Sequence, residues 1–138
     1  LAAGKFLSAG EHLQRAGVYY HFGKFLFVHD PAQMQAAHAK AIACRTDSLP
    51  HLSPAGERVA IPFEGRHLYG ILRKPKDVAH PPLLIMCCGL DSCKEETDAY
   101  EQPFLQRGIA TAGVGIGPSR NTSMPTAVKP DTMADSIM

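Results

Sequence analysis

Apolar residues in the first third of the chain recur at helical spacing. A helix is predicted from Ser8, which forms a capping box with Glu11, to about Val28, and its apolar positions are dense enough for a largely buried helix. A second helix is predicted to run to about Arg45, with Asp30 as its N-cap and a proline directly after the cap. The chain therefore opens with a helical segment.

The period of the apolar pattern changes to two after a stretch rich in Ser, Pro, Asp and Gly. This stretch, residues 47–56, has the composition of a linker and is predicted to separate a helical segment, residues 1–46, from a second region, residues 57–138. The second region opens with two alternating segments, residues 57–63 and 66–75, separated by a Glu-Gly pair. They predict a β-hairpin.

The pattern of the second region predicts a parallel crossover. Residues 83–88, LLIMCC, form a continuous apolar run that is typical of a strand covered on both faces. A helix is predicted over residues 94–107, interrupted or kinked at Pro103 and ended by Gly108, and residues 109–115 predict a second buried strand. Strand, helix and strand in this order imply a parallel pair, so the fold class is α/β. The residues that follow show no convincing periodicity.

Length and charge exclude several classes of protein. The 138 residues are enough for one domain with a hydrophobic core. Fourteen basic and thirteen acidic residues are interspersed, so no face is predicted to bind nucleic acid or an anionic membrane. The longest apolar run is far shorter than the roughly 20 residues of a membrane span, and no signal-peptide pattern opens the chain, which predicts a cytoplasmic protein.

The thiols, histidines and carboxylates form no recognisable metal motif. Cys87 and Cys88 are neighbours in a predicted strand, a poor geometry for disulfides, so reduced thiols are predicted for the four cysteines. No His-Glu-x-x-His or similar pairing occurs, and neither a metal nor a cofactor is predicted. Four carboxylates near the start of the helix after the apolar run resemble a cluster suited to acid–base chemistry, but at the first turns of a helix they are expected to complement its dipole and remain solvated: Glu95, Glu96, Asp98 and Glu101.

The turn after the apolar run is the candidate for chemistry. In an open parallel sheet, the loops that leave the carboxyl ends of the strands line the ligand crevice, and Gly89 to Lys94 occupies such a position. Gly89 would let the backbone turn sharply and leave the N–H groups of Leu90 and Asp91 directed at a negatively charged oxygen, the geometry of an oxyanion hole. On spacing alone, the alternative remains that Gly89 ends the strand and that Asp91 or Ser92 caps the next helix.

A family resemblance covers most of the chain, from about Gly17 to Thr132. In PPLLIMCCGLDSCKEETDAYEQPFLQRGIATAGVGIGP the chain resembles α/β-hydrolases of the 2,6-dihydroxypseudooxynicotine hydrolase type, relatives of the fermentation-respiration switch esterase. It is also similar to them in GVYYHFGKFLFVHDPAQMQAAHAKA, in their N-terminal helical region, and in AVKPDT. It departs from the family at VGIGPSRN, where Gly115 stands near the place of an Asp and Ser119-Arg120 replaces the last glycines of a Gly-Pro-Gly turn.

The resemblance implies roles for individual residues. It implies that Leu90 donates its backbone N–H to the oxyanion of a tetrahedral intermediate and that Gly89 provides the turn. It implies substrate contacts for Asp91, Tyr20 and Phe22, the last two in a helical region that shapes the pocket for an aromatic substrate. Packing between helices remains the alternative for both aromatic residues.

The nucleophile that the resemblance implies is missing. No Gly-x-Ser-x-Gly elbow occurs in the 138 residues, and the family's serine, acid and histidine follow later in the chain order, so Ser92 is interpreted as structural. The resemblance implies the truncated N-terminal part of a serine α/β-hydrolase that acts on an ester or on a C–C bond next to a ketone, inactive alone.

Partners and exposed surfaces follow from the same interpretation. An aromatic ketone or ester is the expected small-molecule substrate, and a homodimer is expected. A sheet cut off after about four strands is expected to expose an edge and a face. A non-catalytic ligand-binding or dimerising module derived from such a hydrolase is the alternative.

Overall fold

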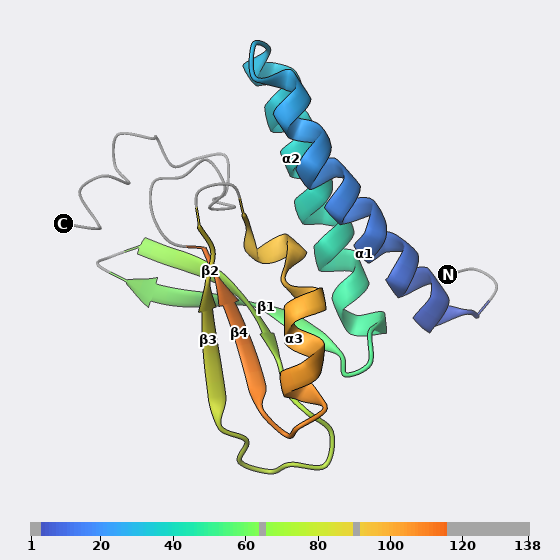
Figure 1. The fold of residues 1–138 in the computed structure, drawn as a ribbon, viewed down its shortest axis with the longest axis vertical. Helices are drawn as coiled ribbons and strands as arrows, with labels where there is room; N and C mark the ends of the chain where they lie inside the picture. The colour runs from blue at the N-terminus through green and yellow to red at the C-terminus, as the bar shows by residue number, and fades with distance from the viewer. Residues whose placement is uncertain (1–3, 64–65, 90–91, 116–138) are drawn as a thin grey trace. The chain divides into compact units, whose positions relative to one another are not determined.

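The computed structural model describes residues 4–63, 66–89 and 92–115 (Figure 1). By its internal contacts the chain divides into two compact units, Leu1–Glu57 and Arg58–Met138. The segment AVKPDT and the departure at VGIGPSRN, apart from its first two residues, lie outside the described residues.

The first unit is a pair of helices with short 3₁₀ turns. Its elements, in chain order, are α1 (Phe6–Gly23), η1 (Lys24–Phe27), α2 (Pro31–Ser48) and η2 (Leu49–His51). α1 and α2 lie side by side and contact one another (Figure 1). Glycine allows α1 to approach α2 closely at Gly17, where a Cβ would lie 3.3 Å from the Ala41 carbonyl oxygen. It allows α1 to approach η2 at Gly10, where a Cβ would lie 2.7 Å from His51 Cβ.

The predicted N-cap is confirmed for α2 and is wrong for α1. Asp30 Oδ1 accepts a hydrogen bond from the Gln33 backbone N–H at 3.1 Å, and Asp30 Oδ2 accepts one from Gln33 Nε2 at 2.9 Å. α1 begins before Ser8, because the Ala9 N–H already donates to the Lys5 carbonyl oxygen at 3.0 Å. Ser8 therefore lies inside the helix and does not cap it.

α2 continues past its predicted end at Arg45. It ends at Ser48, whose hydroxyl donates to the Arg45 carbonyl oxygen at 2.7 Å and so satisfies one of the carbonyl groups that a helix end leaves without a helical partner. η2 follows directly, and only residues 52–55 separate it from the first strand.

The expectation that the first helix is largely buried is wrong for the described chain. Within α1 only Gly10, Gly17 and His21 are buried, whereas Tyr19 is 71% and Phe22 is 56% exposed. The two glycines are seven residues apart and share one face of the helix. α2 covers that face at Gly17 and η2 covers it at Gly10, whereas Tyr19 and Phe22 remain exposed.

The described part of the second unit is built around a four-stranded sheet with the helix α3. Its elements, in chain order, are β1 (Gly56–Phe63), β2 (Arg66–Arg73), β3 (Leu83–Cys87), η3 (Lys94–Glu96), α3 (Asp98–Leu105) and β4 (Ala110–Val114). The strand order is β1-β2-β4-β3, with β2 and β4 antiparallel and β3 and β4 parallel. The predicted crossover of strand, helix and parallel strand is confirmed, as is the position of β1 next to β2 (Figure 1).

The strand register assigns side chains to the two faces of the sheet. Thr111 of β4 is paired with Arg73 of β2 and with Leu84 of β3, so these side chains share one face, and Arg73 bonds to α3 on that face. Leu83 and Ile85 point to the opposite face and are 53% and 62% exposed. The prediction that β3 is covered on both faces is therefore wrong for the described residues. β3 is also the last strand in the order of the described sheet, so it has an unpaired edge there. An exposed edge and an exposed face were expected for a sheet of about four strands.

The helix of the crossover is divided at a different residue from the one predicted. It continues through Pro103 to Leu105, and the break lies at Thr97, between η3 and α3. The Thr97 hydroxyl lies 3.0 Å from the Lys94 carbonyl oxygen, a local bond that competes with regular helix. Gly108, with φ at +78°, follows the helix end as predicted.

Candidate functional site

Gly89 lies at the carboxyl end of β3, the position predicted for a ligand-binding turn. It is exposed, and a Cβ built on it would meet no atom within 4 Å. Its backbone is not in the left-handed region, unlike that of Gly4 and Gly108, so backbone strain does not require glycine at this turn. Among the described residues, Gly89 is therefore accessible at the end of β3. Leu90 and Asp91 lie outside the described residues, and their roles stay predictions.

The described side chains that flank the turn are held in place and do not resemble nucleophiles. The Ser92 hydroxyl donates to the Glu96 carboxylate, which supports a structural interpretation of this serine. Burial raises the pKa of the Cys88 thiol, and the negative charges of Glu95 and Glu96 raise it further, against the lowering effects of a hydrogen bond to Ser92 and the charge of Lys94. A thiol with a raised pKa is a weak nucleophile at neutral pH.

The turn leads directly into a buried ion pair. Lys94 Nζ lies 2.8 Å from Glu95 Oε1, and both side chains are fully buried. Arg58 of β1 approaches the same oxygen at 3.6 Å. Burial raises the pKa of Glu95, but the charge of Lys94, hydrogen bonds from Lys94 and Cys93, and the charge of Arg58 outweigh it and lower the pKa from 4.5 to about 2.

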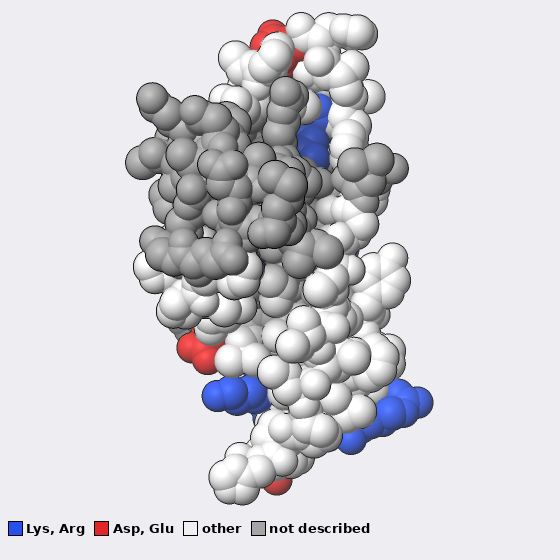
Figure 2. Space-filling model, turned by 90° about the vertical axis from the view of Figure 1, so that its left-hand side faces the viewer, with Lys and Arg blue, Asp and Glu red and all other residues white. Residues whose placement is uncertain are grey.

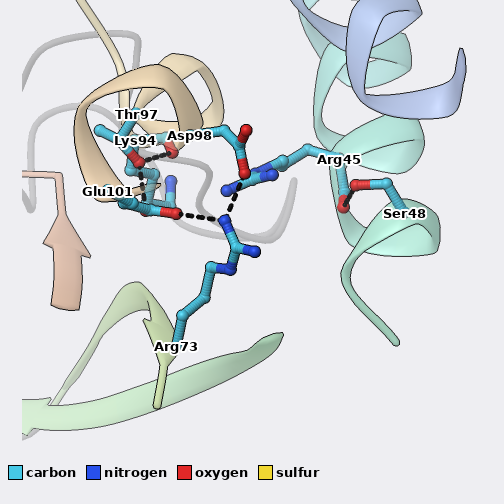
Figure 3. A network of polar contacts seen from close by, with 7 residues as sticks. All are labelled: Arg45, Ser48, Arg73, Lys94, Thr97, Asp98 and Glu101. Carbon is cyan, nitrogen blue, oxygen red and sulfur yellow. Dashed lines mark hydrogen bonds and ion pairs between the residues drawn. The ribbon is translucent and has the colours of Figure 1, made fainter. Parts of the chain in front are cut away.

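A second set of ion pairs connects α3 to β2. Figure 3 shows Arg73 extending from β2 toward α3, where its Nη1 donates to Asp98 Oδ1 and, at 3.1 Å, to Glu101 Oε2. Glu101 Oε1 lies 2.6 Å from the Thr97 hydroxyl. The expectation that the carboxylates after the turn remain solvated is therefore wrong for Glu95 and Glu101, which are fully buried and paired with cations.

Six charged residues thus form what we call the buried ionic network, with Thr97 as its neutral member: Arg58, Arg73, Lys94, Glu95, Asp98 and Glu101. Three carry positive and three carry negative charge, so the network is balanced. A balanced set with short contacts offsets the cost of removing charges from water. The sequence did not indicate the ion pairs of Arg73, because they join residues 25 and 28 positions apart.

The two aromatic candidates lie in the first unit. Tyr20 is 38% exposed, and Lys40 Nζ lies 5.3 Å from the centroid of its ring. Phe22 is 56% exposed and contacts His21 edge to face, with ring centroids 4.9 Å apart. Their predicted contact with substrate stays a prediction.

The described residues show neither a metal cluster nor a membrane span. Among them, no group of three His, Cys, Asp or Glu side chains is arranged to hold a metal ion, and no helix is long and apolar enough to cross a membrane. On the face shown in Figure 2, the visible Lys and Arg side chains of the described part of the chain occur in separate groups among uncharged atoms. The four cysteines, all within the described residues, are free thiols.

The chain is similar to a curated hydrolase and to its solved counterpart. It is 34% identical over 112 residues to the 2,6-dihydropseudooxynicotine hydrolase of Paenarthrobacter nicotinovorans, an alignment that covers 81% of this chain and 30% of that protein. The crystal structure of the 2,6-dihydroxy-pseudo-oxynicotine hydrolase matches 85% of this chain with a TM-score of 0.76 and 31% identity. The chain spans about a third of the length of these relatives, 30% and 33% respectively.

A more distant structure shares the fold. Wild-type AbyA5 matches 96% of this chain and 40% of its own length, with a TM-score of 0.64 and 19% identity. No family model matches the chain. The helices and the mixed four-stranded sheet are thus those of the corresponding part of larger α/β structures.

Proposed function

Since this chain is homologous to the α/β-hydrolases over the part of their fold that it spans, we propose that it supplies the oxyanion-binding turn of a serine-dependent hydrolase. The reaction is acyl transfer to water, with an ester or a C–C bond next to a ketone as the bond that breaks. The observation that supports the proposal is the position of Gly89, which is exposed and lies at the carboxyl end of the parallel strand β3.

The turn acts on charge that develops during the reaction. When a serine attacks the carbonyl carbon, the carbonyl oxygen becomes negative, and the backbone N–H of Leu90 donates a hydrogen bond to it. The serine requires a histidine as base and an acid that orients it. The 138 residues contain no Gly-x-Ser-x-Gly elbow, so the chain alone is expected to show no turnover.

The substrate is proposed to be an aromatic ketone or ester. Two features support this proposal: the relatives' names specify a pseudooxynicotine, and aromatic side chains of α1 are exposed. Tyr20 and Phe22 are proposed to contact the substrate's ring, and Asp91 its polar groups. Aromatic pairs add to the energy of area burial, so loss of either ring should raise KM more than it lowers kcat.

The test uses a chimera in which this chain replaces the corresponding 112-residue stretch of the Paenarthrobacter hydrolase. The chimera should hydrolyse 2,6-dihydroxypseudooxynicotine or p-nitrophenyl esters and react with a fluorophosphonate. Leu90→Pro removes one N–H donor and should lower kcat by about 10²- to 10³-fold, whereas Leu90→Met keeps the donor and should change kcat by less than about threefold. Equal activity of the two variants would exclude the oxyanion role.

The unmodified chain provides the second arm of the test. Purified alone, it should neither hydrolyse p-nitrophenyl acetate nor take up the fluorophosphonate label. Turnover that labels a serine of this chain and is lost in Gly89→Pro would show that the nucleophile lies among its own serines.

A non-catalytic binding or dimerising module is the second candidate. It is favoured by the missing elbow together with the exposed rings of α1, among them Tyr19 at 71% and Phe22 at 56%. Such a module would bind an aromatic ketone in calorimetry without turnover, or would form a dimer in sedimentation experiments. Tyr19→Ser with Phe22→Ser should abolish either property if α1 provides the surface.

A further inference from the structure

We infer that the buried ionic network positions the described residues that close the turn after β3, residues 92–95, with Arg73 as its central positioning residue. The inference rests on the proposed function only in giving the turn its purpose. The evidence for the inference is the contacts at the two ends of the turn, which are strand pairing at its start and ion pairs at its end.

The first end of the turn is fixed by strand pairing. Cys87, the last residue of β3, is in register with Val114 of β4, within the parallel ladder. This pairing places the start of the turn relative to the sheet. It does not determine where the turn ends, because the turn leaves the ladder after Cys87.

The second end of the turn is fixed by charge. Cys93 is buried, and the next two residues, Lys94 and Glu95, form the fully buried ion pair to which Arg58 of β1 is added at 3.6 Å. Arg58 in turn lies over the ring of Tyr69 in β2, 5.3 Å from its centroid. Arg58 therefore connects the residues that close the turn to β1 and β2, the two strands that β4 separates from β3 in the sheet.

Arg73 holds the helix that follows. One nitrogen, Nη1, bonds to carboxylates one turn apart on α3, those of Asp98 and Glu101. Thr97 connects this pair to the turn, because its hydroxyl lies 2.6 Å from Glu101 Oε1 and 3.0 Å from the Lys94 carbonyl oxygen, two acceptors that share its single proton. A shift of Arg73 would therefore pass through Glu101 and Thr97 to the residues that close the turn.

A glycine in β4 leaves space on the sheet for Thr97 and Lys94. A Cβ built at Gly113 of β4 would lie 3.1 Å from Thr97 Oγ1 and 3.6 Å from Lys94 Cβ. The absence of a side chain at Gly113 allows η3 and Thr97 to lie directly on β4. Arg58 of β1 and Arg73 of β2 thus provide cations, Gly113 of β4 leaves space for η3, and β3 ends where the turn begins.

The experiment measures the accessibility of Cys93, one of the residues that close the turn, in the full-length chain, and it requires no catalytic activity. The rate at which iodoacetamide alkylates Cys93, which is 1% exposed, is read by mass spectrometry in the wild type and in Arg73→Met. Exchange of β2 and β4 amides in the same samples reports unfolding of the whole unit. Arg107→Met is the matched control, because Arg107 is exposed, lies just after α3 and donates to the Pro103 carbonyl oxygen at 2.7 Å.

Arg73→Met should raise the Cys93 alkylation rate by about tenfold or more relative to the exchange of β4, since opening is local to the turn and α3. Arg73→Lys should restore part of the protection, because a lysine keeps the charge but not the planar fork. Arg107→Met should change nothing. Parallel increases in alkylation and β4 exchange, or unchanged alkylation in Arg73→Met, would refute positioning and leave a role in stability alone.

The same variants in the chimera separate this inference from the proposed function. A displaced turn should lower kcat and leave KM within about twofold, with partial recovery in Arg73→Lys. If the chimera shows no activity but Cys93 responds as expected, the proposed function fails and positioning stands. If the chimera is active and Cys93 does not respond, positioning fails alone.

Discussion

Glu95→Gln should remove a large part of the acid sensitivity of the second unit. In the wild type, burial of this carboxyl raises its pKa, but Lys94, the Cys93 hydrogen bond and Arg58 together lower it from 4.5 to about 2. The folded state therefore favours the ionised form more than the unfolded chain does. A glutamine keeps the shape and one carbonyl oxygen but has no charge to titrate.

The sign and the size of the effect follow from this pKa. Because the folded pKa is lowered, its contribution to stability is fully present above the unfolded value and is lost as the pH falls toward the folded value. Each pKa unit corresponds to about 1.4 kcal/mol, so the lowered pKa contributes about 3 kcal/mol to the free energy of unfolding at neutral pH. About 2 kcal/mol of this should be lost between about pH 7 and about pH 3.

Urea unfolding followed by circular dichroism, with amide exchange of β2 and β4 to isolate the second unit, measures this difference. Wild type and Glu95→Gln should differ by about 3 kcal/mol near pH 7 and by about 1 kcal/mol near pH 3. Glu57→Gln is the control, because Glu57 is exposed, and it should follow the wild type at every pH. A gap between wild type and Glu95→Gln that does not change with pH would refute the reasoning.

Three glycine substitutions test the packing. Gly10→Ala should lower the free energy of unfolding of the first unit by about 1–3 kcal/mol, because the new Cβ would lie 2.7 Å from His51 Cβ. Gly23→Ala should raise the free energy of unfolding of this unit by about 0.5–1 kcal/mol through helix propensity, because its Cβ would meet no atom within 4 Å. Urea unfolding in which Gly10→Ala is more stable than Gly23→Ala would contradict this packing. Gly113→Ala should lower the stability of the second unit by about 1–2 kcal/mol, since its Cβ would lie 3.1 Å from Thr97 Oγ1; unchanged amide exchange in α3 would count against that contact.

Local sequence signals predicted the elements whose causes are local. Asp30 caps α2 because its side chain and the Gln33 N–H it bonds are three residues apart. The parallel pair of β3 and β4 follows from the chain order of strand, helix and strand. The start of α1 was missed because a good capping pattern at Ser8 does not prevent a helix from beginning earlier.

Burial was predicted less well than the elements themselves. Apolar density in α1 and in residues 83–88 indicated surfaces that favour cover, and both predictions of burial were wrong for the described residues. Density shows what a segment gains from being covered, but another part of the fold has to provide the cover. In α1 the face that is covered carries Gly10 and Gly17, residues that a hydrophobic pattern does not single out.

The position of the candidate site could be predicted from the sequence, but the buried ionic network beside it could not. The turn follows from topology, because loops at the carboxyl ends of parallel strands line the crevice. Arg73 sits at the end of an alternating strand, where a charged residue is usually solvent-facing, and its carboxylate partners lie in an element on the other side of β3 in sequence. The local signals were the adjacent pair Lys94 and Glu95 and the pair Thr97 and Glu101, four residues apart on a helical segment.

The carboxylates beside the turn are unsuited to acid–base catalysis. A general acid or base works best with a pKa near the operating pH, and Glu95, with a pKa of about 2, has no proton to give and little affinity for one at neutral pH. Glu101 has both oxygens engaged, Oε1 with Thr97 and Oε2 with Arg73. The contacts that lower the pKa of Glu95 also fix the residues that close the turn. The acidic residues of η3 and α3 therefore contribute geometry, and the proton transfers of the proposed reaction require groups other than these carboxylates.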